Sequence, residues 1–142
     1  IDSLMKCVKN EDDYNGQKYV VDELCAIAKD HEMHIHLIHH IKKLANEEQT
    51  PGKFDAKGSG AITDQVDNML IHWRNKGKEN AIKRGESHDA SEPDALLICA
   101  KQRNGEDEPL IQLWFDKETH QFVGNHGDRP VSFDSWPHRA WA

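Results

Sequence analysis

The chain has 142 residues, of which 37% are hydrophobic and 30% charged, and this composition suits one domain with a modest core. It contains no apolar run near the roughly 20 residues that span a bilayer and no signal peptide, so we expect no membrane partner and a cytoplasmic location. The net charge of −7 excludes a uniformly basic surface that coats nucleic acid, so nucleic-acid contacts must depend on local lysine and arginine clusters.

The N-terminal part of the chain is predicted to form a helix followed by a strand. Residues 8–18 are polar and contain Asn15-Gly16, which indicates a loop. Residues 17–31 carry apolar side chains at helical spacing, and residues 33–39 read as a strand. A helix followed at once by a strand predicts an α/β unit with a parallel sheet. Because the chain begins at Ile1, without methionine and on what resembles a strand end, we expect a fragment.

The rest of the chain alternates polar segments with short apolar ones. The polar residues 42–58 predict a long loop, and residues 59–67 a short helix. The polar residues 75–94 predict a flexible insertion, and residues 124–142 form a tail without a clear period. Strands are predicted at residues 68–73, 95–101, 110–115 and 117–123, the second and third forming a β-hairpin.

Cysteine and histidine residues raise the question of a metal site. Cys7, Cys25 and Cys99 lack the spacing of a zinc ribbon or a redox motif, so we expect reduced thiols. His34 and His36 would share one face of a strand, and with a third ligand they would suit zinc. The alternative is that these histidines simply line the surface of the sheet.

Two positions at strand ends are typical of nucleotide sites. His40 follows a predicted strand, at the sheet edge where open α/β folds bind ligands, and a histidine there can contact a phosphate. Asp2 ends an apolar strand of which one residue is visible, and such an aspartate can hold Mg²⁺ through water in an ATPase with a phosphate-binding loop. Histidines also end strands without any functional role, so this alternative stays open.

Lys57, Gly58, Ser59 and Gly60 precede a predicted helix and suit an anion. Glycines let the backbone approach a phosphate closely, and the N–H groups at a helix start favour negative charge. A DNA backbone phosphate is one such anion. The alternative is a flexible turn.

Lys101 and Arg103 form a basic pair at the predicted hairpin. Residues two apart on a strand point to the same face, and Asn104-Gly105 favours a tight turn. A lysine and an arginine held side by side suit a triphosphate whose charge grows in the transition state. The alternative is a solvated hairpin tip.

Taken in order, these segments resemble the RecA-like motor domain of DnaB-family replicative DNA helicases, including phage primase-helicases and the mitochondrial helicase Twinkle. The most specific parts are Gly58–Asp67 and Lys101–Gly105. The resemblance implies an α/β fold that is the C-terminal half of a RecA-like P-loop ATPase core, with a mostly parallel sheet and a C-terminal β-hairpin. Residues 1–123 would be this partial motor domain, without its Walker A half, and residues 124–142 an irregular tail.

The resemblance also implies roles for individual residues. Asp2 matches the Walker B aspartate that positions Mg²⁺, and His40 the residue that senses the γ-phosphate of ATP. The loop at 57–60 matches the one that follows single-stranded DNA in the channel of a homo-hexamer. Lys101 and Arg103 match the basic pair that reaches across the subunit interface, with Arg103 as the arginine finger. A primase domain or protein is an implied partner, in a bacterial host cell or encoded by a phage.

The chain departs from the family pattern in two ways. It has no Gly-x-x-x-x-Gly-Lys-Ser/Thr motif, and nothing in it matches the glutamate that activates water. We therefore expect the isolated chain to bind ATP poorly and not to hydrolyse it, whereas the parent protein does both. The alternatives are another RecA-like ATPase of the recombinase type, a noncatalytic histidine-rich interaction module, and a metal hydrolase that uses the histidines.

Overall fold

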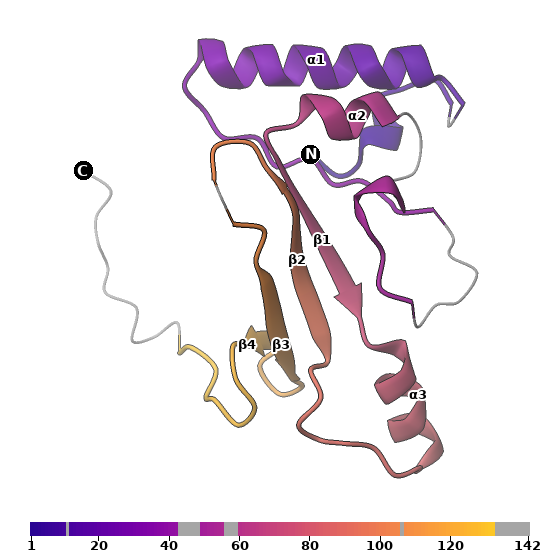
Figure 1. Cartoon of the computed structure of the whole chain (residues 1–142), viewed down its shortest axis with the longest axis vertical. Coiled ribbons are helices and arrows are strands. Elements are labelled where there is room, and N and C mark those ends of the chain that lie inside the picture. The colour runs from indigo at the N-terminus through magenta and orange to yellow at the C-terminus, as the bar shows by residue number, and fades with distance from the viewer. Residues whose placement is uncertain (11, 43–48, 56–59, 106, 133–142) are drawn as a thin grey trace.

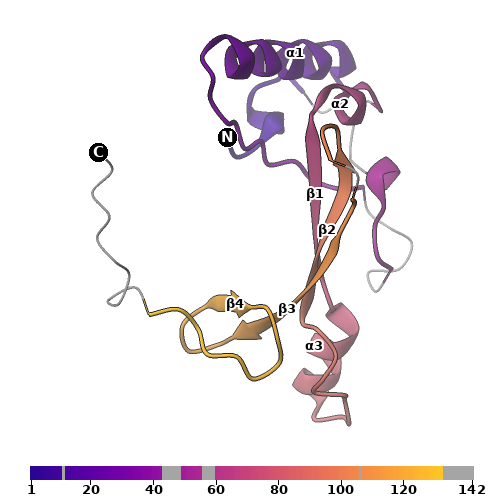
Figure 2. The same ribbon diagram turned by 60° about the vertical axis from the view of Figure 1, so that its left-hand side comes forward.

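The structure, a computed structural model, places two helices at one end of the molecule and a long twisted sheet below them (Figure 1). It describes residues 1–132 except 11, 43–48, 56–59 and 106. Figure 2 shows that a third helix lies at the far end of the sheet. The helices are α1 (Tyr14–Asp30), α2 (Gly60–Gln65) and α3 (Lys76–Arg84), and the strands are β1 (Asn68–Arg74), β2 (Ala95–Gln102), β3 (Leu110–Asp116) and β4 (Gln121–Val123).

Helix α1 begins earlier than its sequence pattern predicts. The side chain of Asp13 accepts a hydrogen bond of 2.9 Å from the Gly16 amide, which satisfies a backbone donor that the first turn leaves unpaired. The loop predicted over residues 8–18 is therefore wrong from Tyr14 onward. Asn15-Gly16 favours a turn locally, but this cap and the buried face of the helix outweigh that preference.

The helical end holds a small apolar core. Leu4, Val21 and Ile62 are buried together, so this core joins the N-terminal segment to α1 and α2. Partly buried side chains surround it, namely Met5, Val20, Cys25, Leu37 and Val66. The three thiols are free, as expected, and Cys99 is buried in the sheet. No helix among the described residues has the length and apolar character to cross a bilayer.

The strand predicted at residues 33–39 is reduced to one isolated parallel bridge, between Asp2 and Ile38. The Ile38 amide donates to the Ile1 carbonyl at 2.9 Å, and the Leu4 amide donates to the Ile38 carbonyl at 3.1 Å. A strand needs a ladder along its length, and this segment is paired at one bridge only. The prediction of a strand is therefore wrong for most of the segment.

The four strands form one sheet in the order β1-β2-β3-β4, and every neighbouring pair is antiparallel. The prediction of a mostly parallel sheet is wrong for these strands, and the bridge at Ile38 is the parallel pairing that the described residues form. The connections from β2 to β3 and from β3 to β4 are short, and short connections join strands in antiparallel fashion because a parallel pair needs a long crossover. The connection from β1 to β2 contains α3, so its length alone does not explain the antiparallel pairing of these two strands. The α/β class is correct, and the RecA-like assignment stays a prediction.

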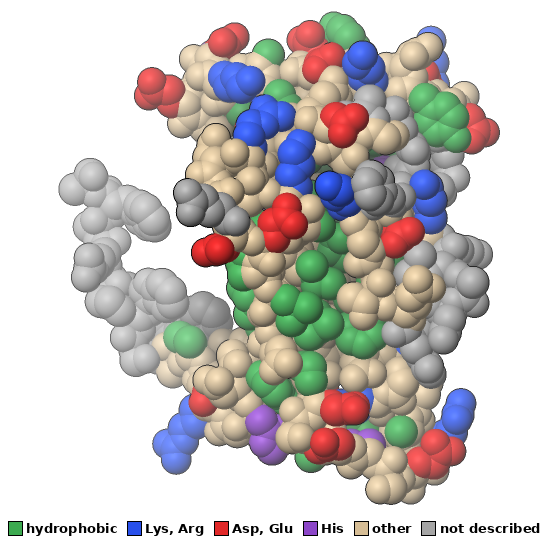
Figure 3. Space-filling model, in the orientation of Figure 1, with side chains coloured by type: hydrophobic (Ala, Val, Ile, Leu, Met, Phe, Trp, Pro, Cys, Tyr) green, Lys and Arg blue, Asp and Glu red, His purple; other side chains and the backbone are tan. Residues whose placement is uncertain are grey.

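The strands of the second half lie close to their predicted positions, and β2 and β3 pair as expected. Their ladder ends at Ile98 and Leu110, so the connection is longer than the tight turn predicted at Asn104-Gly105. Apolar side chains gather over the middle of the molecule, where β1 to β3 run (Figure 3). Leu70 and Ile111 are among those exposed.

The flexible insertion predicted at residues 75–94 is wrong for its first half, which forms α3. The Asn75 side chain accepts a hydrogen bond of 3.0 Å from the Lys78 amide, so it caps the N-terminus of the helix. Gly85 ends the helix in the left-handed conformation, at φ 69°. Glu79 lies in the first turn and Lys83 in the last, which complements the helix dipole.

Candidate functional site

Asp2 lies beside the segment that ends at His40. The parallel bridge pairs Asp2 with Ile38, so Asp2 and the segment that precedes His40, both predicted to serve a nucleotide, are neighbours. Both Asp2 and His40 are exposed. An exposed carboxylate at a strand end suits a water-mediated Mg²⁺ contact, because Mg²⁺ keeps several of its waters when it binds.

The basic pair binds the C-terminal end of α2. The Lys101 Nζ donates to the carbonyls of Thr63 and Asp64, each at 2.8 Å. The Arg103 guanidinium donates to the carbonyls of Asp64 and Gln65 at 3.1 Å and forms an ion pair with Asp67 at 2.7 Å. The last carbonyls of a helix lack partners and carry partial negative charge, so cations are stabilised there. Arg103 lies one residue beyond the end of β2, and both side chains reach the same helix end.

Of the predicted DNA-binding residues, Lys57, Gly58 and Ser59 lie outside the described residues, and Gly60 is the first residue of α2. Gly60 is exposed, and an added Cβ would meet nothing within 4 Å. This six-residue helix therefore has Gly60 at its start and the basic pair at its end. Gly60 and the basic pair therefore lie at opposite ends of the same short helix.

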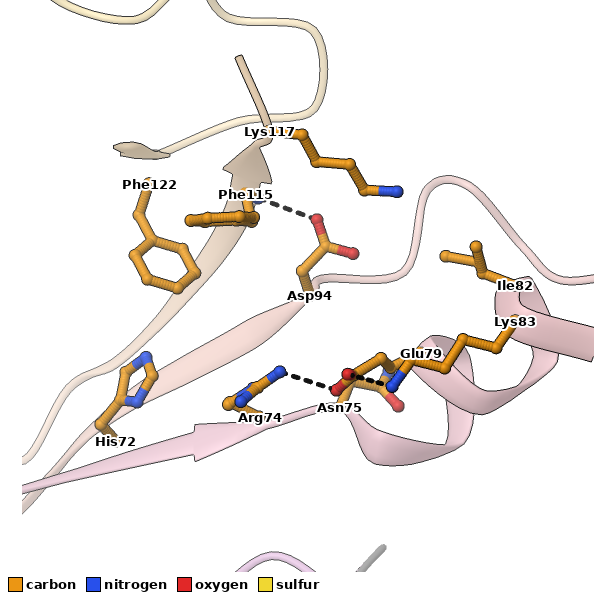
Figure 4. Close-up of a pocket in the computed structure, with 10 residues that line it drawn as sticks. All are labelled: His72, Arg74, Asn75, Glu79, Ile82, Lys83, Asp94, Phe115, Lys117 and Phe122. Atoms are coloured by element: carbon orange, nitrogen blue, oxygen red, sulfur yellow. Dashed lines mark hydrogen bonds and ion pairs between the residues drawn. The ribbon is translucent and has the colours of Figure 1, made fainter. Parts of the chain in front are cut away.

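A cavity of about 540 Å³ lies at the other end of the sheet, between β1, α3, β3 and β4 (Figure 4). Aromatic rings form one side of it. The Phe115 and Phe122 ring centroids are 5.1 Å apart, and the His72 ring lies edge-on to Phe122 at 5.4 Å. The lining residues are His72, Arg74, Asn75, Glu79, Ile82, Lys83, Asp94, Phe115, Lys117 and Phe122.

Charged side chains lie across the cavity from the rings, with Glu79 at their centre (Figure 4). Glu79 pairs with Arg74 and Lys83 at 2.8 Å each and with Lys76 at 3.4 Å. The hydrogen bond from Lys83, followed by the attraction of Arg74, lowers the pKa of Glu79 to about 2. Glu79 is thus a fixed anion that orients the two cations facing the cavity.

A planar, anionic aromatic molecule fits these properties. Ring faces stack on a heterocycle, and a guanidinium such as that of Arg74 stacks on a π system while it attracts negative charge. The cations Arg74, Lys83 and Lys117 outnumber the carboxylates Glu79 and Asp94 in the lining. The cavity therefore suits a planar aromatic ring that carries a negatively charged group, as in a nucleotide.

Sequence reasoning missed this cavity, because it treated residues 75–94 as an insertion. The available signal was the pattern of helix ends: Asn75 before the helix and Gly85 after it, with Glu79 and Lys83 four residues apart between them. With a helix predicted there, its side chains could have been considered as a wall of a site together with Phe115 and Phe122.

The described residues do not gather three metal-ligating side chains of the His, Cys, Asp or Glu type at any one place. His34 and His36 do lie side by side, with ring centroids 4.5 Å apart. No protein-family model matches the chain. No curated protein matches it either. The resemblance to DnaB-family helicases therefore depends on the sequence motifs alone and stays a prediction.

Proposed function

We propose that the chain is the C-terminal part of an ATP-dependent hexameric DNA helicase, which translocates on single-stranded DNA and unwinds duplex DNA. The observation that carries the proposal is the cavity in which Phe115 and Phe122 face Arg74, since it combines stacking surfaces with positive charge. The motif order adds the phosphate-directed residues Asp2 and His40. The phosphate-binding loop itself would lie outside these 142 residues.

The positions of the cavity and the basic pair favour a nucleotide held between two copies of the chain. Strand β2 runs from Ala95, beside the cavity, to the region of Lys101. At about 3.3 Å per residue these positions are roughly 20 Å apart. Lys101 and Arg103 would therefore not reach a base in the cavity of their own chain. A neighbouring copy would supply them, as in a ring.

In this proposal each residue acts on a different part of ATP. Asp2 would hold Mg²⁺ through water and His40 would face the γ-phosphate at the helical end of one copy. The rings and Arg74 that hold the base would belong to a neighbouring copy, because the cavity of the same chain lies at the other end of the sheet. Arg103 of a copy other than the one that holds the base would meet the charge that develops during hydrolysis.

The contacts of the basic pair with α2 offer a link between ATP and DNA. When Lys101 and Arg103 turn toward a neighbouring nucleotide, the carbonyls at the end of α2 lose their donors. Helix α2 begins at Gly60, the last residue of the proposed DNA-binding loop. A change at one end of this short helix would therefore alter the position of the loop at the other end.

The decisive experiment is ATP hydrolysis by the intact protein with Arg103→Ala. We expect hydrolysis to be abolished, nucleotide binding to be largely kept, and mixed rings with wild-type protein to be inactive. Arg84→Ala is the matched control, because Arg84 is an exposed arginine at the end of α3. A ring that hydrolyses ATP normally with Arg103→Ala would refute the finger assignment.

The cavity is tested by Phe115→Ala. Stacking of a base on an aromatic ring contributes about 1–3 kcal/mol, so ATP binding should weaken roughly 5- to 150-fold. Binding of inorganic triphosphate, which has no base, should not change. Tyr19→Ala removes an exposed aromatic ring from α1 and serves as the control. Equal losses for ATP and triphosphate would exclude a base in the cavity.

The DNA-binding loop is tested by Lys57→Ala. Each lysine that neutralises a phosphate contributes to the salt dependence of DNA affinity, so single-stranded DNA binding should weaken and its salt dependence should flatten. Lys18→Ala, an exposed lysine on α1, is the control. Unchanged affinity at all salt concentrations would count against this loop.

A further inference from the structure

Lys78 is a buried lysine that contacts Asp94, one of the residues lining the proposed base site. The residue is only 8% exposed. Its ammonium forms an ion pair with Asp94 at 2.9 Å and donates to the Glu92 carbonyl at 2.5 Å and to the Ala90 carbonyl at 3.4 Å. A buried ammonium is stable only when it is paired and hydrogen-bonded, and three acceptors meet that need here.

Asp94 connects this lysine to the aromatic side of the cavity. One carboxylate oxygen, Oδ1, binds Lys78, and the other, Oδ2, accepts a hydrogen bond of 2.8 Å from the Phe115 amide. The Asp94 backbone is held as well, because its amide donates to Leu113 and its carbonyl accepts from Asn75, each at 2.9 Å. Asp94 therefore joins α3 and the end of β1 to strand β3 at the residue whose ring lines the cavity (Figure 4).

We infer that Lys78 is a positioning residue for the nucleobase: it orients the Asp94 carboxylate, which holds the backbone of Phe115 and so places its ring. The inference rests on the proposed function for the identity of the ligand, and on the contacts of Asp94 with Lys78 and Phe115 for the positioning. Packing alone does not require a charge at this place, because an apolar side chain of similar length fills the same space without the cost of burying an ammonium. What the charge adds is a fixed direction for the Asp94 carboxylate.

The test compares Lys78→Met with Lys76→Met. Lys76 lies on the same helix and pairs with Glu79 at 3.4 Å, so its loss removes a lysine without disturbing Asp94. In the intact protein, the first measurement is hydrogen exchange of the Phe115 amide. The second is the affinity for two probes, ATP and inorganic triphosphate.

We expect Lys78→Met to speed exchange of the Phe115 amide by about tenfold, because the bond to Asp94 that protects it loses its support. ATP binding should weaken by a similar factor, whereas triphosphate binding should not change. Lys76→Met should alter none of these. Because Lys78→Met leaves a partly buried, unpaired carboxylate, the double variant Lys78→Met with Asp94→Asn provides a check against simple misfolding. The neutral amide oxygen can still accept from Phe115, so protection should recover.

The results separate the two claims. Exchange at Phe115 no faster in Lys78→Met than in Lys76→Met would overturn the inference, as would equal weakening of ATP and triphosphate. A rise in exchange that the double variant does not reverse would also overturn it, because the lysine would then act through general stability. If exchange responds as expected but the wild-type protein binds no ATP, the proposed function fails while the positioning of Phe115 by Lys78 stands.

Discussion

Replacing Lys101 by methionine removes the ammonium that binds the end of α2 and keeps most of the aliphatic stem. Two hydrogen bonds of 2.8 Å, to the carbonyls of Thr63 and Asp64, are lost. Hydrogen bonds that involve a charged group contribute about 1.5–3 kcal/mol each when well shielded. Lys101 is half-buried and these carbonyls lie at an accessible helix end, so we expect a total loss of about 1–2 kcal/mol in the free energy of unfolding.

The measurement is equilibrium unfolding in urea, where the midpoint should fall and the slope should stay constant. Lys29→Met is the control, because Lys29 is an exposed lysine in the last turn of α1. A loss for Lys101→Met within about 0.5 kcal/mol of the control would refute the capping role, since surface substitutions commonly have effects of that size. The proposed contact with a neighbouring nucleotide would then be the remaining explanation for Lys101.

Three further predictions concern stability. Leu4→Ala should lower the free energy of unfolding, measured in urea, by about 2–5 kcal/mol, because Leu4 is fully buried against Val21. A loss below about 1 kcal/mol, the size expected of a surface substitution, would contradict this. The pKa of Glu79 is lowered from 4.5 to about 2, so the stability that the ionised Glu79 contributes is complete above pH 4.5 and is lost as the pH falls toward 2. Glu79→Gln should therefore make the melting temperature less sensitive to acid between pH 4.5 and 2. An unchanged pH profile would show that the ion pairs of Glu79 do not cause this sensitivity. Gly85→Ala should lower the free energy of unfolding by about 1 kcal/mol, because φ of Gly85 is 69° and alanine is strained there. Gly124→Ala is the control and should have little effect. Equal stabilities of the two variants would argue against a left-handed helix end at Gly85.

The strands of the second half were predictable because their signals are local. The apolar runs around Leu97 and Leu113 are bounded by polar segments, and both became strands within a residue or two of the expected limits. Helix α1 followed from its apolar stripe, whereas its start depended on a single cap at Asp13, which the neighbouring Asn15-Gly16 obscured.

The parallel pairing and the cavity were harder to predict, because both depend on residues far apart in the chain. Asp2 meets Ile38 with the whole of α1 lying between them in the chain, and the period of a short apolar segment does not reveal its partner. The cavity draws its walls from β1, α3, β3 and β4, and a helix rich in charged residues such as α3 looks like a loop by composition. The contacts of Lys101 and Arg103 with α2 could not be predicted either, because the alternation of side chains along a strand does not show which other element they meet.

In the β1-β2-β3-β4 sheet every strand is hydrogen-bonded to the one that follows it in the chain. Contacts between sequence neighbours close small loops, which costs little chain entropy, and a low contact order favours rapid folding. The pairing of Asp2 with Ile38 needs a much larger loop to close. We therefore expect the amides of strands β1 to β4 to become protected first during refolding, and helices α1 and α2 to pack against this sheet afterwards.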